Sequence, residues 1–263
     1  MRISGRRVWG MVLRHLYNFR HNLDRLTDAF YWPALDIVIW GLTISALEKQ
    51  GQAAFGQIAM VLFAAILWYI VWRGQGEITI GLLEEFWSEN FANLFTTPLT
   101  VTEWMIASCI LGLFKLVLTV VFTALLAWFL YTANFLSLGL AVVPFITSLL
   151  IFGWAFGFFM AGLFLRAGTN IQTLAWAGGF ALMPFSAVYY SLETLPLWVQ
   201  KVGLWLPTTY IFEGMRRVIF NGVIPWDMIA KSFGLNAIYL VFSIWFFYRS
   251  FAKARRNGLA QLH

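Results

Sequence analysis

The chain alternates between long apolar runs and short polar stretches. Beyond residue 28, six runs are apolar on every side of a helix and are 17 to 27 residues long. A helix without a polar face is typical of a membrane or a deeply buried core, and about 20 apolar residues cross the roughly 30 Å hydrocarbon layer of a bilayer. The pattern therefore predicts six transmembrane helices, at residues 29–47, 56–72, 105–131, 140–165, 173–190 and 232–248.

The first 27 residues follow a helical period instead. At 100° per residue, Arg7, Arg14 and Arg25 fall on one face. The opposite face is apolar and carries Val8, Trp9, Val12, Leu13, Leu16, Phe19 and Leu23. A basic amphipathic helix lies along a membrane surface, and the segment lacks the compact apolar core of a signal peptide. We expect residues 1–27 to form a cytoplasmic interfacial helix; the alternative is a solvated helix packed on a soluble domain.

Composition excludes a water-soluble globule, because 60% of the residues are hydrophobic and only 11% are charged, against about 25% charged in soluble domains. The formal net charge is +6, but the basic residues flank apolar runs, so we expect contact with membrane lipids and no nucleic-acid partner. Twelve Lys and Arg fall in the predicted inside segments and five in the outside ones, which places both termini in the cytoplasm. The single cysteine, Cys109, excludes an intrachain disulfide.

Residues 191–227 do not fit a simple span or a simple loop. Pro196, Pro207 and Pro225 interrupt short apolar runs there. A helical hairpin that dips into the outer leaflet would account for them, provided protein or water satisfies its backbone; the alternative is an external loop with Trp198 and Trp205 at the interface. The predicted fold is all-α: a polytopic membrane protein with six transmembrane helices, the N-terminal interfacial helix and an outer re-entrant hairpin before the last span. Its parts are residues 1–27, a transmembrane domain at 28–250 and a basic cytoplasmic tail at 251–263.

The predicted inside loop at residues 73–104 is acidic. It holds five glutamates against one basic residue, Arg73. Cytoplasmic loops usually carry positive charge, so an acidic one indicates contact with a protein. Pro98 ends a short helix there, and aromatic or apolar side chains of this helix could fill a partner's groove; they are Phe86, Trp87, Phe91, Leu94 and Phe95. The alternative is a solvated surface helix.

Two charged residues lie inside predicted spans at comparable depth, Asp36 in the first and Lys115 in the third. Ionisable residues in a bilayer usually have a partner or face a hydrated cavity. We therefore expect Asp36 and Lys115 to pair and to join these two helices, as a structural contact more than a transport site. The sequence has no glycine-rich phosphate loop and no histidine within a span, so we expect no catalytic residues, no metal site and no nucleotide site in this chain.

Taken in order, these features resemble the membrane subunit of type-2 ABC exporters, the ABC-2 permease family. The stretch from Glu85 through Thr97-Pro98-Leu99 to Glu103 is similar to the family's coupling helix. The residues expected to couple to an ATPase are Glu84, Glu85, Phe86, Trp87, Glu89, Phe91, Leu94 and Pro98. The second stretch is similar to the family's external re-entrant motif, and its residues are Pro196, Pro207, Tyr210, Glu213 and Arg216.

The resemblance implies a permease subunit without its own ATPase site, in the bacterial cytoplasmic (inner) membrane. A second permease copy, identical or related, would complete the pathway, and a separate ABC ATPase subunit would bind ATP and Mg and drive export. From the residues alone, a self-sufficient channel or an ion-coupled secondary transporter is the alternative, although such a protein needs more ionisable positions near the membrane midplane. A membrane-embedded enzyme is a third reading.

Overall fold

The computed structural model describes residues 3–21, 23–51 and 56–257, and within them every regular element is a helix. The α-helices are α1 (Gly5–His21), α2 (Leu23–Lys49), α3 (Gln57–Trp87), α4 (Phe91–Leu94), α5 (Val101–Tyr131), α6 (Val142–Ala167), α7 (Leu174–Leu182), α8 (Leu197–Gly203), α9 (Pro207–Asn221) and α10 (Trp226–Asn257). Short 3-10 helices lie between them: η1 (Phe135–Ala141), η2 (Gly168–Ile171), η3 (Pro184–Ser186) and η4 (Leu192–Thr194). The predicted tail at 251–263 is described as far as Asn257, where it continues α10; its last six residues lie outside the described part.

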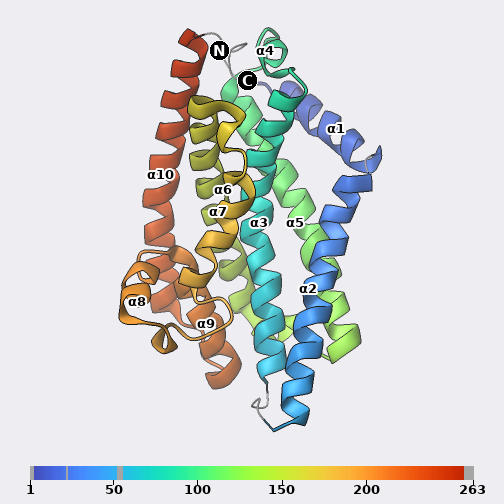
Figure 1. The fold of residues 1–263 in the computed structure, drawn as a ribbon, viewed down its shortest axis with the longest axis vertical. Coiled ribbons are helices and arrows are strands. Elements are labelled where there is room, and N and C mark those ends of the chain that lie inside the picture. Colours follow the sequence, from blue (N-terminus) through green and yellow to red (C-terminus); the bar gives the residue numbers. More distant parts are fainter. Residues whose placement is uncertain (1–2, 22, 52–55, 258–263) are drawn as a thin grey trace.

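Five helices in the described part of the chain are long and apolar enough to cross a membrane: α2, α3, α5, α6 and α10, with short flanking turns. They stand side by side, and α1 and α4 lie at the same end of the bundle as the end of α10 (Figure 1). The protein is thus an all-helical, multi-pass membrane protein. These five helices contain the predicted spans other than the one at 173–190, apart from a residue or two at the ends.

The central helix is α3. Of the 18 most apolar consecutive residues of α3, 67% are buried, whereas the same fraction is 17% for α2 and 22% for α10. Its closest neighbour is α6, because glycines let the two backbones touch. A Cβ on Gly153 would lie 2.8 Å from the carbonyl oxygen of Val71 and 3.1 Å from Cα of Gly74. One turn further on, a Cβ on Gly157 would lie 3.1 Å from Cβ of Ile78. Small residues allow such close contact in membrane helices, and the order of the contacts shows that α3 and α6 run parallel.

Consecutive long helices α6 and α10 also run parallel. Oγ of Ser148 lies 2.7 Å from Oγ of Ser232 near the start of both helices. Near their ends, Nε of Arg166 donates to Oγ of Ser250 at 2.8 Å. The chain between them must therefore travel back along the whole bundle. It does so through α7 and then through α8 and α9, which lie at the end of the bundle opposite α1 (Figure 1).

The prediction of a full-length span at 173–190 is not confirmed. The helix α7 has nine residues, too few to cross a bilayer as an α-helix. Pro184 follows it, in η3, and Ala187 has a left-handed φ of 52°. Proline lacks the N–H that would continue the helix. The sequence predicts only a kink at Pro184 within a longer span, because the residues on both sides of it are apolar.

The helix that contains the second predicted span continues past the predicted end of that span. The sequence predicts a span that ends at Trp72 and a loop at 73–104; α3 continues to Trp87, so the first part of that segment is helical. Glycines disfavour helix interiors, but here Gly74 packs on Gly153 and the side chain of Gln75 donates to the carbonyl oxygen of Ala175 at 3.0 Å. Tertiary contacts thus outweigh the local preference, and the loop proper is limited to residues 88–100.

The helix predicted within residues 1–27 is present as α1, but the face it buries differs in part from the predicted one. Val8, Val12 and Phe19 are buried as expected, together with Met11. Trp9, Leu13 and Leu23 from the predicted apolar face are exposed. The side chain of Arg25 lies outside the described residues. The bundle covers one edge of the apolar face, so α1 retains an exposed apolar edge suited to lipid.

The close contact of α3 with α6 gives the first prediction. In Gly153→Ala, the added methyl group would meet backbone atoms of α3 at 2.8 Å and 3.1 Å, which do not move aside easily. We expect a destabilisation of about 1–3 kcal/mol, measured as a lower apparent melting temperature of the purified protein in detergent. The control is Gly234→Ala on α10, where a Cβ meets nothing within 4 Å. Equal stability of the two variants would contradict the packing described here.

Candidate functional site

The loop between α3 and α5 is compact and lies at the end of the bundle next to α1 (Figure 1). The helix α3 ends where N–H of Ser88 donates to the carbonyl oxygen of Glu84 at 3.0 Å, and Glu89 then takes a left-handed φ of 52°. The four-residue helix α4 follows. The helix α5 begins with a capping box between Thr100 and Glu103, in which each side chain bonds the other's backbone N–H.

The aromatic residues of this loop pack on their own protein. Phe86, Phe91 and Leu94 are buried. The rings of Phe86 and Phe91 are 4.8 Å apart, and the ring of Phe95 lies 4.9 Å from that of Phe251 on α10. The prediction that Phe86, Phe91 and Leu94 fill a partner's groove is therefore wrong, because their surface is already used.

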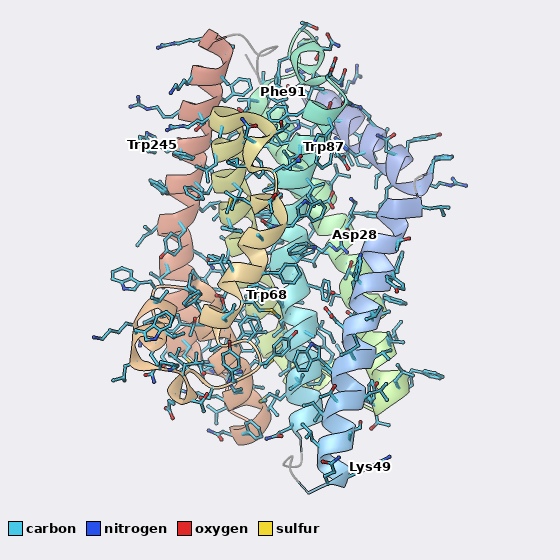
Figure 2. All side chains as sticks on the ribbon, in the orientation of Figure 1. Asp28, Lys49, Trp68, Trp87, Phe91 and Trp245 are labelled. Atoms are coloured by element: carbon cyan, nitrogen blue, oxygen red, sulfur yellow. The ribbon has the colours of Figure 1, made fainter. Side chains whose placement is uncertain are left out.

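What the loop exposes is mostly polar. The exposed residues are Trp87, Ser88, Glu89, Asn93, Thr96, Thr97 and Pro98. In Figure 2, Phe91 lies nearer the tip of this loop than Trp87 does. The indole N–H of Trp87 donates to the side chain of Gln172 at 2.9 Å, which ties the end of α3 to the turn before α7.

Two buried carboxylates attach α1 to the ends of α3 and α5. Glu85 is 2% exposed; Arg14 lies 3.0 Å from it, and Asn90 donates to it at 2.8 Å. Glu103 is fully buried and accepts from Arg7 at 2.6 Å and from N–H of Ser4 at 2.7 Å. The hydrogen bond to Glu103 raises the pKa of the Arg7 guanidinium above its ordinary value. Buried carboxylates require such partners, so Glu85 is part of the bundle and is not presented to another protein.

The predicted pair of Asp36 and Lys115 does not form. Nζ of Lys115 lies 2.7 Å from the carboxylate of Glu77 on α3. Asp36 accepts instead from the hydroxyl of Tyr69, also on α3, at 2.6 Å. Both charges did need partners, as expected, but the central helix supplies them. Glu77 was overlooked because the sequence placed it in a loop.

A further ion pair lies beside these two. The guanidinium of Arg73 is 3% exposed and binds both the side chain and the backbone carbonyl oxygen of Asp28 on α2. Figure 2 shows Asp28 at the edge of α2 that faces α3. On α3, Tyr69, Arg73 and Glu77 follow one another at intervals of four residues, so the three share one face of the helix.

The ion pairs of Arg73 with Asp28 and of Lys115 with Glu77 line a cavity of about 620 Å³ between α1, α2, α3, α5 and α7, here called the α3 groove. Its lining includes His15, Asp28, Trp32, Trp72, Arg73, Gly76, Glu77, Ile80, Gly81, Glu84, Trp87, Trp104, Lys115 and Trp176. Sequence reasoning missed it. The signal was the spacing of Arg73, Glu77 and Glu84, which fall on one face once the helix is continued past Trp72. In the part of the chain that the structure describes, no group of three or more His, Cys, Asp or Glu residues is arranged to hold a metal ion.

Residues 191–227 contain the 3-10 helix η4 and the α-helices α8 and α9, and α10 begins at Trp226. Pro196 precedes α8 and Pro207 is the first residue of α9, where a missing N–H is harmless. The hydroxyl of Tyr210 donates to the carbonyl oxygen of Leu204 at 2.9 Å. The predicted motif residues therefore shape this segment.

Arg216 holds the broken segment after α7. It is buried and donates to the carbonyl oxygens of Ala187, Val188 and Tyr190. Its charge is paired with Glu213, whose carboxylate also accepts from N–H of Leu192 at 2.6 Å. Backbone carbonyl groups without a helical hydrogen bond need other donors. Here the guanidinium of Arg216 donates to three such groups.

Long apolar helices, a charged groove and a compact loop at one end define a multi-pass helical membrane protein. Comparison with known families gives the same class: the profile of ABC-2 family transporter proteins matches residues 38–249. The match covers most of the chain, from within α2 to within α10. The chain belongs to this family, and it is a membrane permease of an ABC-type transporter. No curated protein matches the chain.

The partner found for Lys115 gives the second prediction. Glu77→Lys and Lys115→Glu each place two like charges together in a largely buried site, and we expect each to destabilise the protein by about 2–5 kcal/mol. The double variant restores an ion pair, so it should recover most of the yield of folded protein in membranes. The matched control exchanges Asp36 and Lys115 and should give no recovery. Recovery by the control alone would contradict the pairing of Lys115 with Glu77.

Proposed function

We propose that this chain is the permease subunit of an ATP-driven exporter, in which residues 88–100 receive the movement of a separate cytoplasmic ATPase subunit. The single observation that carries this proposal is the exposed polar tip of a loop whose apolar side is fixed to the bundle. Glu89 and Asn93 are exposed at the tip, while Phe91 between them is buried. A protein-binding loop needs both a free surface and a rigid base.

The base of the loop connects it to three helices at once. It joins α3 directly to α5, and the ion pairs of Glu85 with Arg14 and of Glu103 with Arg7 add α1. A displacement of the loop is therefore passed to α3 and α5, which line the α3 groove, and to α1, which covers it. Rigid elements with alternative arrangements are the usual carriers of such movement. ATP and Mg would be bound by the ATPase subunit.

A second copy of the permease, identical or related, completes the proposed assembly. The charged side of α3 is covered by only part of the chain, since Trp32 and Trp176 at the groove are 58% and 42% exposed. A pathway through a membrane must be closed against lipid on all sides. A single copy of the chain does not close the α3 groove in this way. The distribution of Lys and Arg supports a cytoplasmic location of both termini, in the bacterial cytoplasmic membrane, with residues 191–227 as the external re-entrant hairpin.

Charge reversal at the tip tests the contact with the ATPase. In Glu89→Arg with Asn93→Arg the buried side of the loop is untouched, and unfavourable charge contacts should reduce association roughly tenfold or more. The measurement is co-purification from membranes of an ATPase subunit encoded beside this chain. The matched control is Glu193→Arg with Asn221→Arg, exposed residues at the opposite end of the bundle, which should not change the yield of the complex. Undiminished association of the tip variant would refute the assignment.

Cysteine labelling tests the orientation. With Cys109→Ser as background, Asn93→Cys should react with a membrane-impermeant maleimide only after the cells are opened. Asn221→Cys, at the other end of the bundle, should react in intact cells, because both positions are exposed and differ only in the side of the membrane. Labelling of residue 93 in intact cells would place the loop outside, where a cytoplasmic ATPase has no access to it.

A further inference from the structure

Cations gather where α6 and α10 end side by side. Arg166 belongs to the last turn of α6, and Arg249 and Lys253 lie near the end of α10. All three residues are exposed. In the part of the chain that the structure describes, no carboxylate forms an ion pair with any of them. The surface at this end of α6 and α10 therefore carries positive charge that the described residues do not neutralise.

Aromatic rings hold two of these cations in place. The guanidinium of Arg166 lies 4.4 Å from the ring centre of Phe246 on α10. Phe246 in turn packs directly on α6, because a Cβ on Gly162 would lie 2.7 Å from its ring. The guanidinium of Arg249 lies 5.4 Å from the ring centre of Trp245. A planar guanidinium that stacks on a ring keeps N–H groups at its edge for an anion.

The cations continue an apolar stripe along α10. At 100° per residue, a face about 60° wide carries, in order, Phe242, Phe246, Arg249 and Lys253. Phe242 and the neighbouring Trp245 are 48% and 52% exposed, and Figure 2 shows Trp245 on the side of α10 that faces away from the other helices. An apolar stripe that ends in basic residues is typical of a helix that passes from acyl chains to lipid headgroups.

A second cavity lies between the same two helices. Its volume is about 280 Å³, and α6 and α10 supply most of its lining, which is apolar except for Tyr239 and Ser243. Phe159 and Phe242 belong to this lining. The ring of Phe159 lies 5.2 Å from that of Phe246, so a continuous aromatic surface connects the cavity to the ring beneath Arg166.

The depth of the cavity suits an acyl chain. At 1.5 Å per residue, Phe242 lies roughly 10 Å and Tyr239 roughly 15 Å from Arg249 along α10. One leaflet contributes about half of the roughly 30 Å hydrocarbon layer. A lipid with its headgroup at Arg249 therefore has its acyl chains at the level of the cavity.

We propose that the surface between α6 and α10 binds one anionic phospholipid, here called the lipid site. Arg166 and Arg249 bind the phosphate, and one acyl chain enters the cavity of about 280 Å³. A small soluble anion would leave the cavity unused, and a lipid without net charge would leave the cations unpaired. The lipid site shares no lining residue with the α3 groove, so its lipid is a part of the folded protein and not the cargo. It does not depend on the proposed function.

The test compares two lipids with the same acyl chains. The full chain is purified in detergent and titrated with palmitoyl-oleoyl-phosphatidylglycerol or palmitoyl-oleoyl-phosphatidylcholine, and bound lipid is counted by native mass spectrometry. We expect one phosphatidylglycerol to bind at least about fivefold more tightly than phosphatidylcholine, as roughly one basic residue near an anionic lipid provides. An excess of glycerophosphoglycerol, the same headgroup without chains, should not displace it. Equal affinity for the two lipids, or displacement by the headgroup alone, would overturn the proposal.

Charge variants locate the headgroup. Arg249→Gln and Arg166→Gln should each weaken binding of phosphatidylglycerol about fivefold and leave that of phosphatidylcholine unchanged. The matched control is Arg255→Gln, which removes an exposed cation of the same helix end, about 120° around the helix from Arg249. It should bind as the unchanged protein does. Equal weakening by the control would show a diffuse basic surface in place of a site.

A bulky residue locates the acyl chain. Leu182 lines the cavity, and Leu182→Trp should weaken binding of phosphatidylglycerol about threefold or more by filling part of it. The control is Leu204→Trp, at an exposed position outside the lining, which should leave binding unchanged. Full binding by Leu182→Trp would place the chain elsewhere and contradict the proposed site.

An acidic surface of a partner protein is the competing occupant of the cations. If Arg249→Gln keeps its preference for phosphatidylglycerol and no longer co-purifies with the ATPase subunit, the cations face a protein and the lipid site is refuted. If Arg249→Gln loses that preference and still co-purifies with the ATPase subunit, the lipid site is supported.

Discussion

The close parallel contact of α3 with α6 sets the arrangement of the other elements. Gly74 on one helix and Gly153 and Gly157 on the other bring the backbones together, and this fixes which side of α3 is turned to the apolar interior. At 3.6 residues per turn, Val71 and Ile78, which touch α6, lie about 140–160° around the helix from Arg73 and about 100–120° from Glu77. The charged side of α3 is therefore directed away from α6, toward α2 and α5, where a polar groove forms inside an otherwise apolar bundle.

Charges at this position are stable because each has a partner on another helix. Arg73 is paired with Asp28 on α2 and Lys115 on α5 is paired with Glu77. Breaking a buried pair is costly, because the remaining charge stays desolvated. The pairs thus connect α2 and α5 to the central helix through groups that also face the groove. Structural support and the polar lining of the groove therefore come from the same residues.

The parallel arrangement of α6 and α10 imposes a second constraint. A chain that returns between two parallel helices needs a crossing segment, and here α7 crosses only in part before Pro184 breaks it. The carbonyl groups freed after the break are bound by the guanidinium of Arg216. The segment therefore combines irregular backbone with a fixed shape, which membrane proteins allow where other protein groups satisfy the hydrogen bonds.

The sequence by itself determined the class of protein, most of the long helices and the presence of a loop within residues 73–104, because apolar periodicity and prolines act locally. It also determined that Asp36 and Lys115 need partners, since isolated charges are unfavourable in a membrane. Only the tertiary structure decided that these partners are Tyr69 and Glu77. It also decided that α3 extends to Trp87, that α7 ends at Leu182 and that Phe91 is buried. Each of these depends on a residue distant in the chain, such as Gly153 for the glycines of α3 or Phe251 for the aromatic rings of the loop. A single sequence contains both residues of such a contact but does not say that they lie close together in space. Local preferences allow several arrangements of the helices, and the contacts between distant residues decide which one forms.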